Sequence, residues 1–265
     1  MIRRASGTRP PAGGLFVRGP LLACAAALAV AGCAGPGAPT ATPRPAIRTL
    51  TELKGADDPA WPQVQQWIAA APQVEVLPAD PARADAVLPA LQGTLDSTLG
   101  AVAHRSGGLL VDHGWLRILG AGSARMQRSL ATWNDGRIPL DAAGRPTMLL
   151  VADDVLGGFF AINGGALGPE QGKVWYLAPD TLKWEHLDLG YADFVAWALS
   201  PRLVEFYAGQ RWPRWEAEVA RLDGDHALAV YPPLWAEGPT IDRRSRKAVP
   251  VDELYRLTME YRVRL

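Results

Sequence analysis

The chain has 265 residues, 48% of them hydrophobic, and its 27 basic residues balance its 27 acidic ones. Both cysteines lie within the first 33 residues, which leaves none for a disulfide further along. All four basic residues of the first 32 are arginines. Without them, 23 basic residues stand against 27 acidic ones, a net charge near −4. This charge argues against nucleic acid or an anionic membrane surface as a partner.

Residues 1–33 have the layout of a bacterial signal peptide. Arginines without any acidic residue precede the apolar run LLACAAALAVAG, which is too short and too rich in alanine to span a membrane. The run ends in VAGC, from Val30 to Cys33, which resembles the lipobox of bacterial lipoproteins. In that family the cysteine is acylated and the chain is cut just before it. The alternative is an ordinary signal peptide with an incidental cysteine.

We therefore expect a signal peptide over residues 1–32 and attachment to a membrane through lipid on Cys33. By resemblance to known sorting rules, Ala34 favours the periplasmic side of the outer membrane if the cell is Gram-negative. Residues 33–46 follow as a tether, since AGPGAPTATPRPA has almost no apolar bulk to bury. A single domain is expected over residues 47–265.

The first half of this domain predicts helices and then strands. Asp58 and Pro59 open one helix in DDPAWPQVQQWIAAA, and Asp80 and Pro81 repeat the signature before a second. VEVLP, between them, predicts a short strand. LGAVAHRSGGLLVDHGWLRILG predicts three short strands, and TMLLVADD one more.

The segment GGFFAINGGALG, residues 157–168, raises the choice between a phosphate-binding loop and a strand connection. A phosphate loop needs a helix start with Lys and Ser or Thr after its last glycine, whereas Gly168 is followed by Pro-Glu-Gln. Asn163-Gly164 supplies the positive φ angles of a tight turn, so a hairpin into KVWYLA is favoured. Helical spacing then returns from residue 191 and at the C-terminus. The fold class predicted is α+β, with an antiparallel-rich sheet and helices at both ends of the domain.

Several long segments, among them VEVLPADPARADAVLPALQ, VADDVLGGFFAINGGALG and FYAGQRWPRWEAEV, resemble the uncharacterised bacterial family called domain of unknown function 2625. The resemblance runs from Ile47 to about Val251 and implies no catalytic residues, because the family has no established activity. The lipobox extension departs from family members, which begin near Ile47. The pattern of elements is also similar to the SUKH superfamily of immunity proteins, which implies a toxin as partner.

The candidates for chemistry are Asp112-His113 and Asp153-Asp154, each at a predicted strand end. Neighbours on a strand point to opposite faces, so adjacent carboxylates do not readily share a metal or a proton. Turn chemistry, in which Asp accepts backbone N–H bonds, is the favoured interpretation; a catalytic or metal role is the alternative. The sequence predicts no cofactor and no metal site.

A second candidate is the segment QRWPRWEAE, where arginine and tryptophan alternate around a proline. Such a mixture is typical of binding surfaces, but internal cation–π packing is the favoured interpretation, since the restart of a helix needs an anchor. The partner-facing candidates are Arg211, Trp212, Arg214 and Trp215. The function predicted is therefore an exported binding protein with a protein partner. The alternative is an envelope hydrolase or a metal-dependent enzyme that uses the strand-end Asp and His residues.

Overall fold

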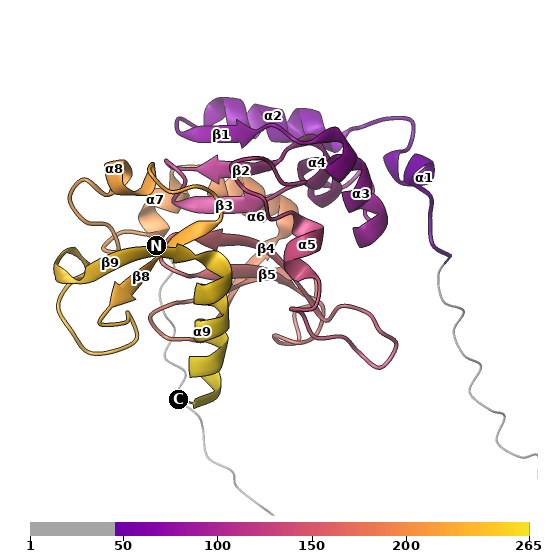
Figure 1. Cartoon of the computed structure of the whole chain (residues 1–265). Helices are drawn as coiled ribbons and strands as arrows, with labels where there is room; N and C mark the ends of the chain where they lie inside the picture. The colour runs from indigo at the N-terminus through magenta and orange to yellow at the C-terminus, as the bar shows by residue number, and fades with distance from the viewer. Residues whose placement is uncertain (1–45, 265) are drawn as a thin grey trace, which may run out of the picture. The chain divides into compact units, whose positions relative to one another are not determined.

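A seven-stranded antiparallel sheet organises residues 46–264, the part of the chain that the computed structural model describes (Figure 1). Its strands lie side by side in chain order, and each pairs antiparallel with the next. This architecture confirms the α+β prediction. The predicted signal peptide, Cys33 and nearly all of the tether lie outside the described residues. The strands are β1 (Val74–Leu77), β2 (Gly108–Val111), β3 (Leu116–Leu119), β4 (Met148–Asp154), β5 (Phe159–Asn163), β6 (Lys173–Leu177) and β7 (Trp184–Gly190).

Helices α6 (Tyr191–Ala198) and α7 (Arg202–Phe206) pack on one face of the sheet. The ring of Phe160 on β5 lies 5.1 Å from that of Phe194, and the ring of Tyr176 on β6 lies 5.2 Å from that of Phe206. Both partners belong to the helical segment after β7, where the sequence predicted helices from residue 191. The helices are α1 (Leu50–Lys54), α2 (Ala60–Ala70), α3 (Pro81–Leu91), α4 (Thr98–Arg105), α5 (Leu130–Asn134), α6 (Tyr191–Ala198), α7 (Arg202–Phe206) and α8 (Trp215–Val219).

The C-terminal segment covers the opposite face, in front of the sheet in Figure 1. Strands β8 (His226–Tyr231) and β9 (Ser245–Pro250) form a two-stranded ribbon, joined by the short 3₁₀ helix η1 (Ile241–Arg243), and α9 (Val251–Arg264) follows. The ring of Tyr255 on α9 lies edge-on to that of Phe159, 4.9 Å away. Because Phe159 and Phe160 are neighbours on one strand, their contacts identify the two faces. No helix within residues 46–264 is long and apolar enough to cross a bilayer.

The prediction of a strand at AVAHR is wrong, because residues 98–105 form helix α4. Ser97 caps this helix by accepting from the amide of Gly100 at 3.1 Å. A Cβ at Gly100 would lie 2.0 Å from the carbonyl oxygen of Thr94, so only glycine permits this close approach. Residues 100–103 are all small or β-branched and buried, and a short apolar run of this kind is also consistent with a buried strand. Helices α1 and α5 and strand β9 were also not predicted.

The connection between β5 and β6 is a hairpin, but not a tight one. Asn163 ends β5, and nine residues, 164–172, precede β6. The Asn163 side chain organises this loop: its Oδ1 accepts from the amides of Gly165 and Leu167 at 2.7 and 3.0 Å, and its Nδ2 donates to the carbonyl of Gly168 at 2.7 Å. The loop is therefore held by a buried side chain instead of a two-residue turn.

Candidate functional site

Asp112 and His113 form the turn of the β2–β3 hairpin. Both adopt left-handed backbone conformations, with φ of 53° and 60°, and Gly114 follows at 87°. Such a turn matches the twist of two antiparallel strands. The Asp112 carboxylate forms an ion pair with Arg211, and the His113 ring lies edge-on to Trp215 at 5.7 Å. Arg211 and Trp215 thus hold the turn in place, and His113 at its tip stays exposed.

Asp153 and Asp154 are the last residues of β4, and both are fully buried on opposite faces of the sheet. On the helical face, Asp154 accepts hydrogen bonds from the hydroxyls of Tyr176 and Tyr207 at 2.8 and 3.0 Å. It also accepts from the amides of Leu156 and Gly158, both at 2.9 Å. Burial raises the pKa of Asp154, although these hydrogen bonds oppose the rise. This is the turn chemistry that the sequence favoured.

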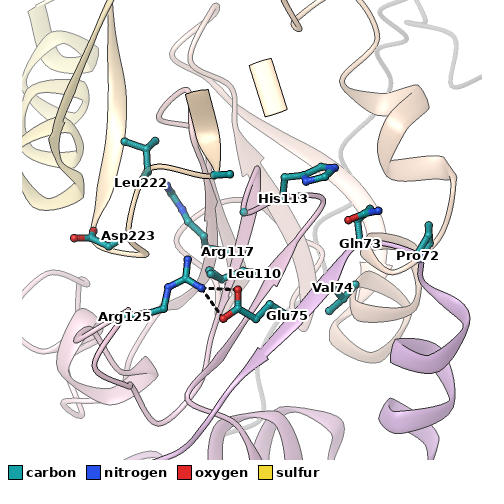
Figure 2. Close-up of a pocket in the computed structure, with 12 residues that line it drawn as sticks. Pro72, Gln73, Val74, Glu75, Leu110, His113, Arg117, Arg125, Leu222 and Asp223 are labelled. Atoms are coloured by element: carbon teal, nitrogen blue, oxygen red, sulfur yellow. Dashed lines mark hydrogen bonds and ion pairs between the residues drawn. The ribbon is translucent and has the colours of Figure 1, made fainter. Parts of the chain in front are cut away.

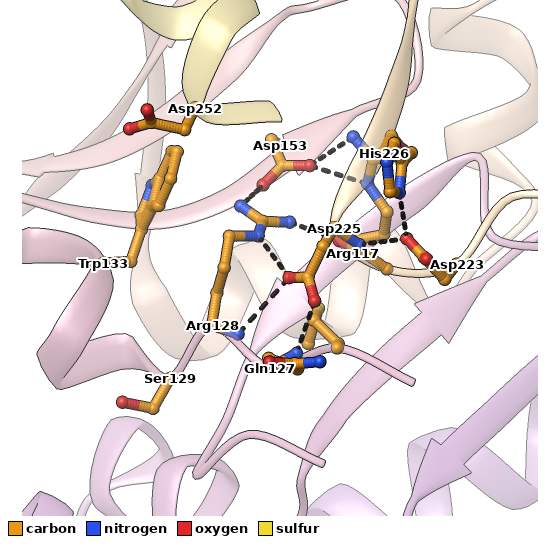
Figure 3. A network of polar contacts seen from close by, with 12 residues as sticks. Arg117, Gln127, Arg128, Ser129, Trp133, Asp153, Asp223, Asp225, His226 and Asp252 are labelled. Carbon is orange, nitrogen blue, oxygen red and sulfur yellow. Dashed lines mark hydrogen bonds and ion pairs between the residues drawn. The ribbon is translucent and has the colours of Figure 1, made fainter. Parts of the chain in front are cut away.

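Asp153 lies at the centre of an ionic network on the other face (Figure 3). Arg117, directly across the ladder on β3, donates from Nε to Asp153 Oδ1 at 2.6 Å. Arg128 donates from Nη1 to Asp153 Oδ2 at 2.6 Å and from Nε to Asp225 Oδ1 at 3.1 Å. Arg117 also donates to the carbonyls of Asp154 and His226, at 2.8 and 2.6 Å. The network joins β3 and β4 to the start of β8.

The segment around Pro213 packs inward. Trp212 and Trp215 are only 4% and 8% exposed, so their rings belong to the core and are not a partner-facing surface. Arg211 stacks on Trp215, with 4.3 Å between its Cζ and the ring centroid. Of the four predicted residues, Arg214 alone is exposed, and its φ of 65° marks the start of α8. The burial corrects the surface interpretation in favour of cation–π packing.

A pocket of about 360 Å³ lies beside β1, which is an edge strand of the sheet (Figure 2). Arg125 and Glu75 face each other across its floor, with Arg125 Nη1 2.6 Å from both carboxylate oxygens. Their side chains are 47% and 51% exposed. His113, Gln73, Asp223, Leu110, Leu222 and part of Arg117 complete the charged and apolar lining.

The structure brings only one of the four predicted chemical residues to this pocket. His113 lines it, whereas the carboxylates of Asp153 and Asp154 are engaged in their own networks. Among residues 46–264, no three His, Cys, Asp or Glu side chains are grouped so as to hold a metal ion. What the pocket offers instead is an exposed ion pair, an imidazole and apolar surface at an open sheet edge.

The amino-acid sequence matches the family model described as "Protein of unknown function DUF2625" over residues 50–254. The chain belongs to the DUF2625 family. It is 41% identical over 219 residues to the "Putative uncharacterized protein YbfG" of Escherichia coli strain K12, covering 82% of this chain and 98% of that protein. It is 37% identical over 211 residues to an "Uncharacterized protein" of Haemophilus influenzae, covering 79% of this chain and 92% of that protein. The family resemblance seen in the sequence is confirmed, and these DUF2625 relatives bring no assigned activity.

Sequence reasoning missed the arginines and Glu75. A signal for Arg117 was present, because a single charged residue inside the apolar strand WLRILG must find a buried partner. Its partner, Asp153, was singled out for another role. Glu75 and Arg125 are 50 residues apart, and no local pattern joins them. The pairing of β1 with β2 is one of the long-range contacts that bring the pocket together.

Proposed function

We propose that this chain is an exported lipoprotein, anchored through lipid on Cys33, whose DUF2625 domain binds a protein partner at the pocket beside β1. The observation that carries the binding site is the half-exposed Glu75–Arg125 pair at the open edge of the sheet. Surface ion pairs contribute little stability, about 0–1 kcal/mol, so a partner can replace one member at small cost. The layout of residues 1–33 supports the anchor.

The engagement of the carboxylates supports binding over catalysis. Asp154 accepts four hydrogen bonds, which uses the acceptor sites of a carboxylate. Asp153 is shared by two arginines, and Asp112 is paired with Arg211. A general base or a nucleophile needs a lone pair that is open to substrate.

The alternative is a hydrolase centred on His113. It rests on one observation, namely that this imidazole shares the pocket with the carboxylates of Glu75 and Asp223. Asp223 is paired with His226 at 2.7 Å and Glu75 with Arg125, so substrate would have to displace at least one cation.

The anchor is tested by Cys33→Ser in cells that express the full chain. We expect the variant to leave the membrane fraction and to lose the mass of the acyl groups, because the thiol is the attachment point. A Cys33→Ser variant that stays membrane-bound would contradict the anchor. So would a wild-type protein that still begins at an unmodified Met1.

The binding site is tested by photo-crosslinking in cells. A benzophenone amino acid at Gln73 lies in the pocket lining, and one at Ala142 in an exposed turn elsewhere is the control. We expect a discrete crosslinked protein from position 73 alone. The double swap Glu75→Arg with Arg125→Glu keeps an ion pair within the chain but reverses the charges that a partner meets, so it should abolish that product.

Equal crosslinking from both positions, or a product that the swap does not change, would overturn the site. Mass spectrometry of the crosslinked product then identifies the partner class. The SUKH likeness implies a toxin, and an envelope protein would instead favour a role in assembly or scaffolding.

A further inference from the structure

Strand β1 is a terminal strand of the sheet, and within the described part of the chain it pairs with β2 alone. In an antiparallel pair, residues that exchange backbone hydrogen bonds alternate with residues that do not. The amide of Asp112 donates to the carbonyl of Gln73 at 2.6 Å, so Gln73 and, two residues further on, Glu75 are the hydrogen-bonded positions. The N–H and C=O groups of Val74 and Val76 therefore point to the open side of β1, where a further strand would pair.

Of the two edges of the sheet, the edge at β1 is the one suited to accept a strand. The side chain of Glu75 is 51% exposed, Val76 is 37% exposed, and the register of β1 with β2 is continuous. Strand β7, at the other edge, has a register shift against β6 and a left-handed residue, Asp188, with φ of 56°. Such bulges protect natural edge strands against further pairing. β1 has no protection of this kind.

The side chains of β1 specify what an added strand must carry. Glu75 lies on the same face of the sheet as Arg117 and Asp153. It would meet the opposite residue of an added strand at a non-hydrogen-bonded position, where side chains come closest. Opposite charges stabilise such a pair, so a lysine or an arginine is favoured there. The residues on either side of that basic residue would face Val74 and Val76, where apolar side chains fit. The complementary segment is therefore extended and reads apolar–basic–apolar.

A second copy of the chain is a poor occupant of this edge. The antiparallel register that pairs Val74 of one copy with Val76 of the other uses all the outward backbone groups of both strands. The same register places Glu75 directly opposite Glu75 of the second copy, and like charges in that position are destabilising. The charge on β1 thus favours a different protein over self-association.

We infer that the partner at the pocket beside β1 is a protein with an extended apolar–basic–apolar segment, which adds to the sheet as an eighth strand, antiparallel to β1. This inference rests on the proposed function and specifies how that partner binds. The backbone groups of Val74 and Val76 bond the segment, and its basic side chain takes over the Glu75 carboxylate from Arg125 (Figure 2). Because the Glu75–Arg125 pair is half-exposed, this exchange costs little. In strand addition, backbone hydrogen bonds supply affinity and alternate side chains supply specificity.

A cyclised β-hairpin peptide whose outer strand reads Thr-Val-Lys-Val-Thr is the first probe. Added to the isotopically labelled protein, it should shift the NMR signals of the Val74 and Val76 amides and slow their hydrogen exchange. N-methylation of the two valine amides of the probe removes the donors that face β1, and should weaken binding by about tenfold or more. A hairpin that leaves both amide signals unchanged, or N-methylation without effect, would overturn strand addition.

The charge is tested by a second hairpin with glutamate in place of the lysine. It should bind wild type about threefold more weakly than the lysine probe, and it should bind Glu75→Lys more tightly than that probe does. Equal affinity of the two hairpins for both proteins would overturn the basic residue assigned to the segment.

Crosslinking in cells distinguishes this inference from the proposed function. Val76→Pro removes an outward amide but no hydrogen bond to β2, and Val76→Thr is the matched control that keeps the amide. With the benzophenone amino acid at Gln73, we expect the crosslinked partner to be lost in Val76→Pro and kept in Val76→Thr, while the melting temperatures stay similar. The N-methylated probe tests the same bonds without any change to the chain. A crosslinked product that persists in both variants would refute strand addition and leave the proposed site intact. Absence of a product from position 73 in the otherwise wild-type chain would contradict the proposed function, and this inference with it.

Discussion

Replacement of Arg117 by methionine is the sharpest test of the network between the sheet and the β8–β9 ribbon. The Arg117 side chain is 1% exposed, and that of Asp153 is not exposed at all. The substitution preserves most of the volume but removes the hydrogen bonds to Asp153 and to the carbonyls of Asp154 and His226. Breaking a buried pair from one side costs about 3–5 kcal/mol, because it leaves a charge without compensation.

The contact of Asp153 with Arg128, which the variant retains, places the expected loss of stability at the lower end of that range. Arg128 still donates to Asp153 at 2.6 Å in the variant, so the negative charge keeps one partner. We therefore expect a loss of about 3 kcal/mol in the free energy of unfolding, a large part of the 5–15 kcal/mol typical of a domain. Urea denaturation followed by tryptophan fluorescence measures it, since the chain has ten tryptophans.

A double-mutant cycle separates the ion pair from general damage to packing. In Arg117→Met with Asp153→Leu, both charges of the pair are gone, and we expect a smaller loss than the sum of the two single variants by about 1–3 kcal/mol. Strict additivity, or a loss below about 1 kcal/mol for Arg117→Met alone, would show that the pair does not act as described.

Three further predictions concern the other face and the β5–β6 loop. Gly158→Ala should lower the free energy of unfolding by about 3 kcal/mol or prevent folding, because its Cβ would lie 2.2 Å from Asp154 Oδ2 and 2.4 Å from the Tyr176 hydroxyl. Thermal denaturation measures the loss, and the control Gly190→Ala, whose Cβ would meet nothing closer than 3.5 Å, should be nearly neutral. Since burial raises the folded-state pKa of Asp154, the native state keeps this proton to higher pH than the unfolded state, in which an Asp has its ordinary pKa of about 4. The stability advantage of wild type over Asp154→Asn should therefore shrink as the pH rises above about 4, and an advantage that grows with pH would refute this. Asn163→Ala removes two bonds from backbone amides and should raise hydrogen exchange across residues 164–172, with the strands unchanged.

The elements that could be predicted from the sequence are those with strong local signals. Asp80 with Pro81 marked the start of α3, and the apolar run before Asp153 marked β4, both as observed. Helix α4 was interpreted as a strand because a short buried apolar run suits either element, and because its start depends on a close approach of Gly100 to Thr94. Strand β9 is polar and largely exposed, so its sequence lacks the alternation typical of strands.

For the candidate site residues too, the local positions could be predicted and the long-range contacts could not. The sequence located Asp112, His113, Asp153 and Asp154 at strand ends, and the structure places them there. The amides that Asp154 accepts from are close in the chain, but the side-chain partners could not be predicted. They lie far away, 36 residues for Arg117 with Asp153 and 99 for Arg211 with Asp112. The pocket beside β1 depends on three such long-range associations, and none of them leaves a motif.

The chain-order arrangement of β1 to β7 has a consequence for how the molecule is made. Each strand pairs with the strand that precedes it in the chain, so the sheet can grow one strand at a time, and the short connections within its hairpins favour rapid folding. The last 40 residues, with the ribbon and α9, can seal their side only after every strand is in place. A chain that is still being synthesised would thus expose Phe159 and its neighbours until its last residues are complete, and a chaperone would be needed most in this interval.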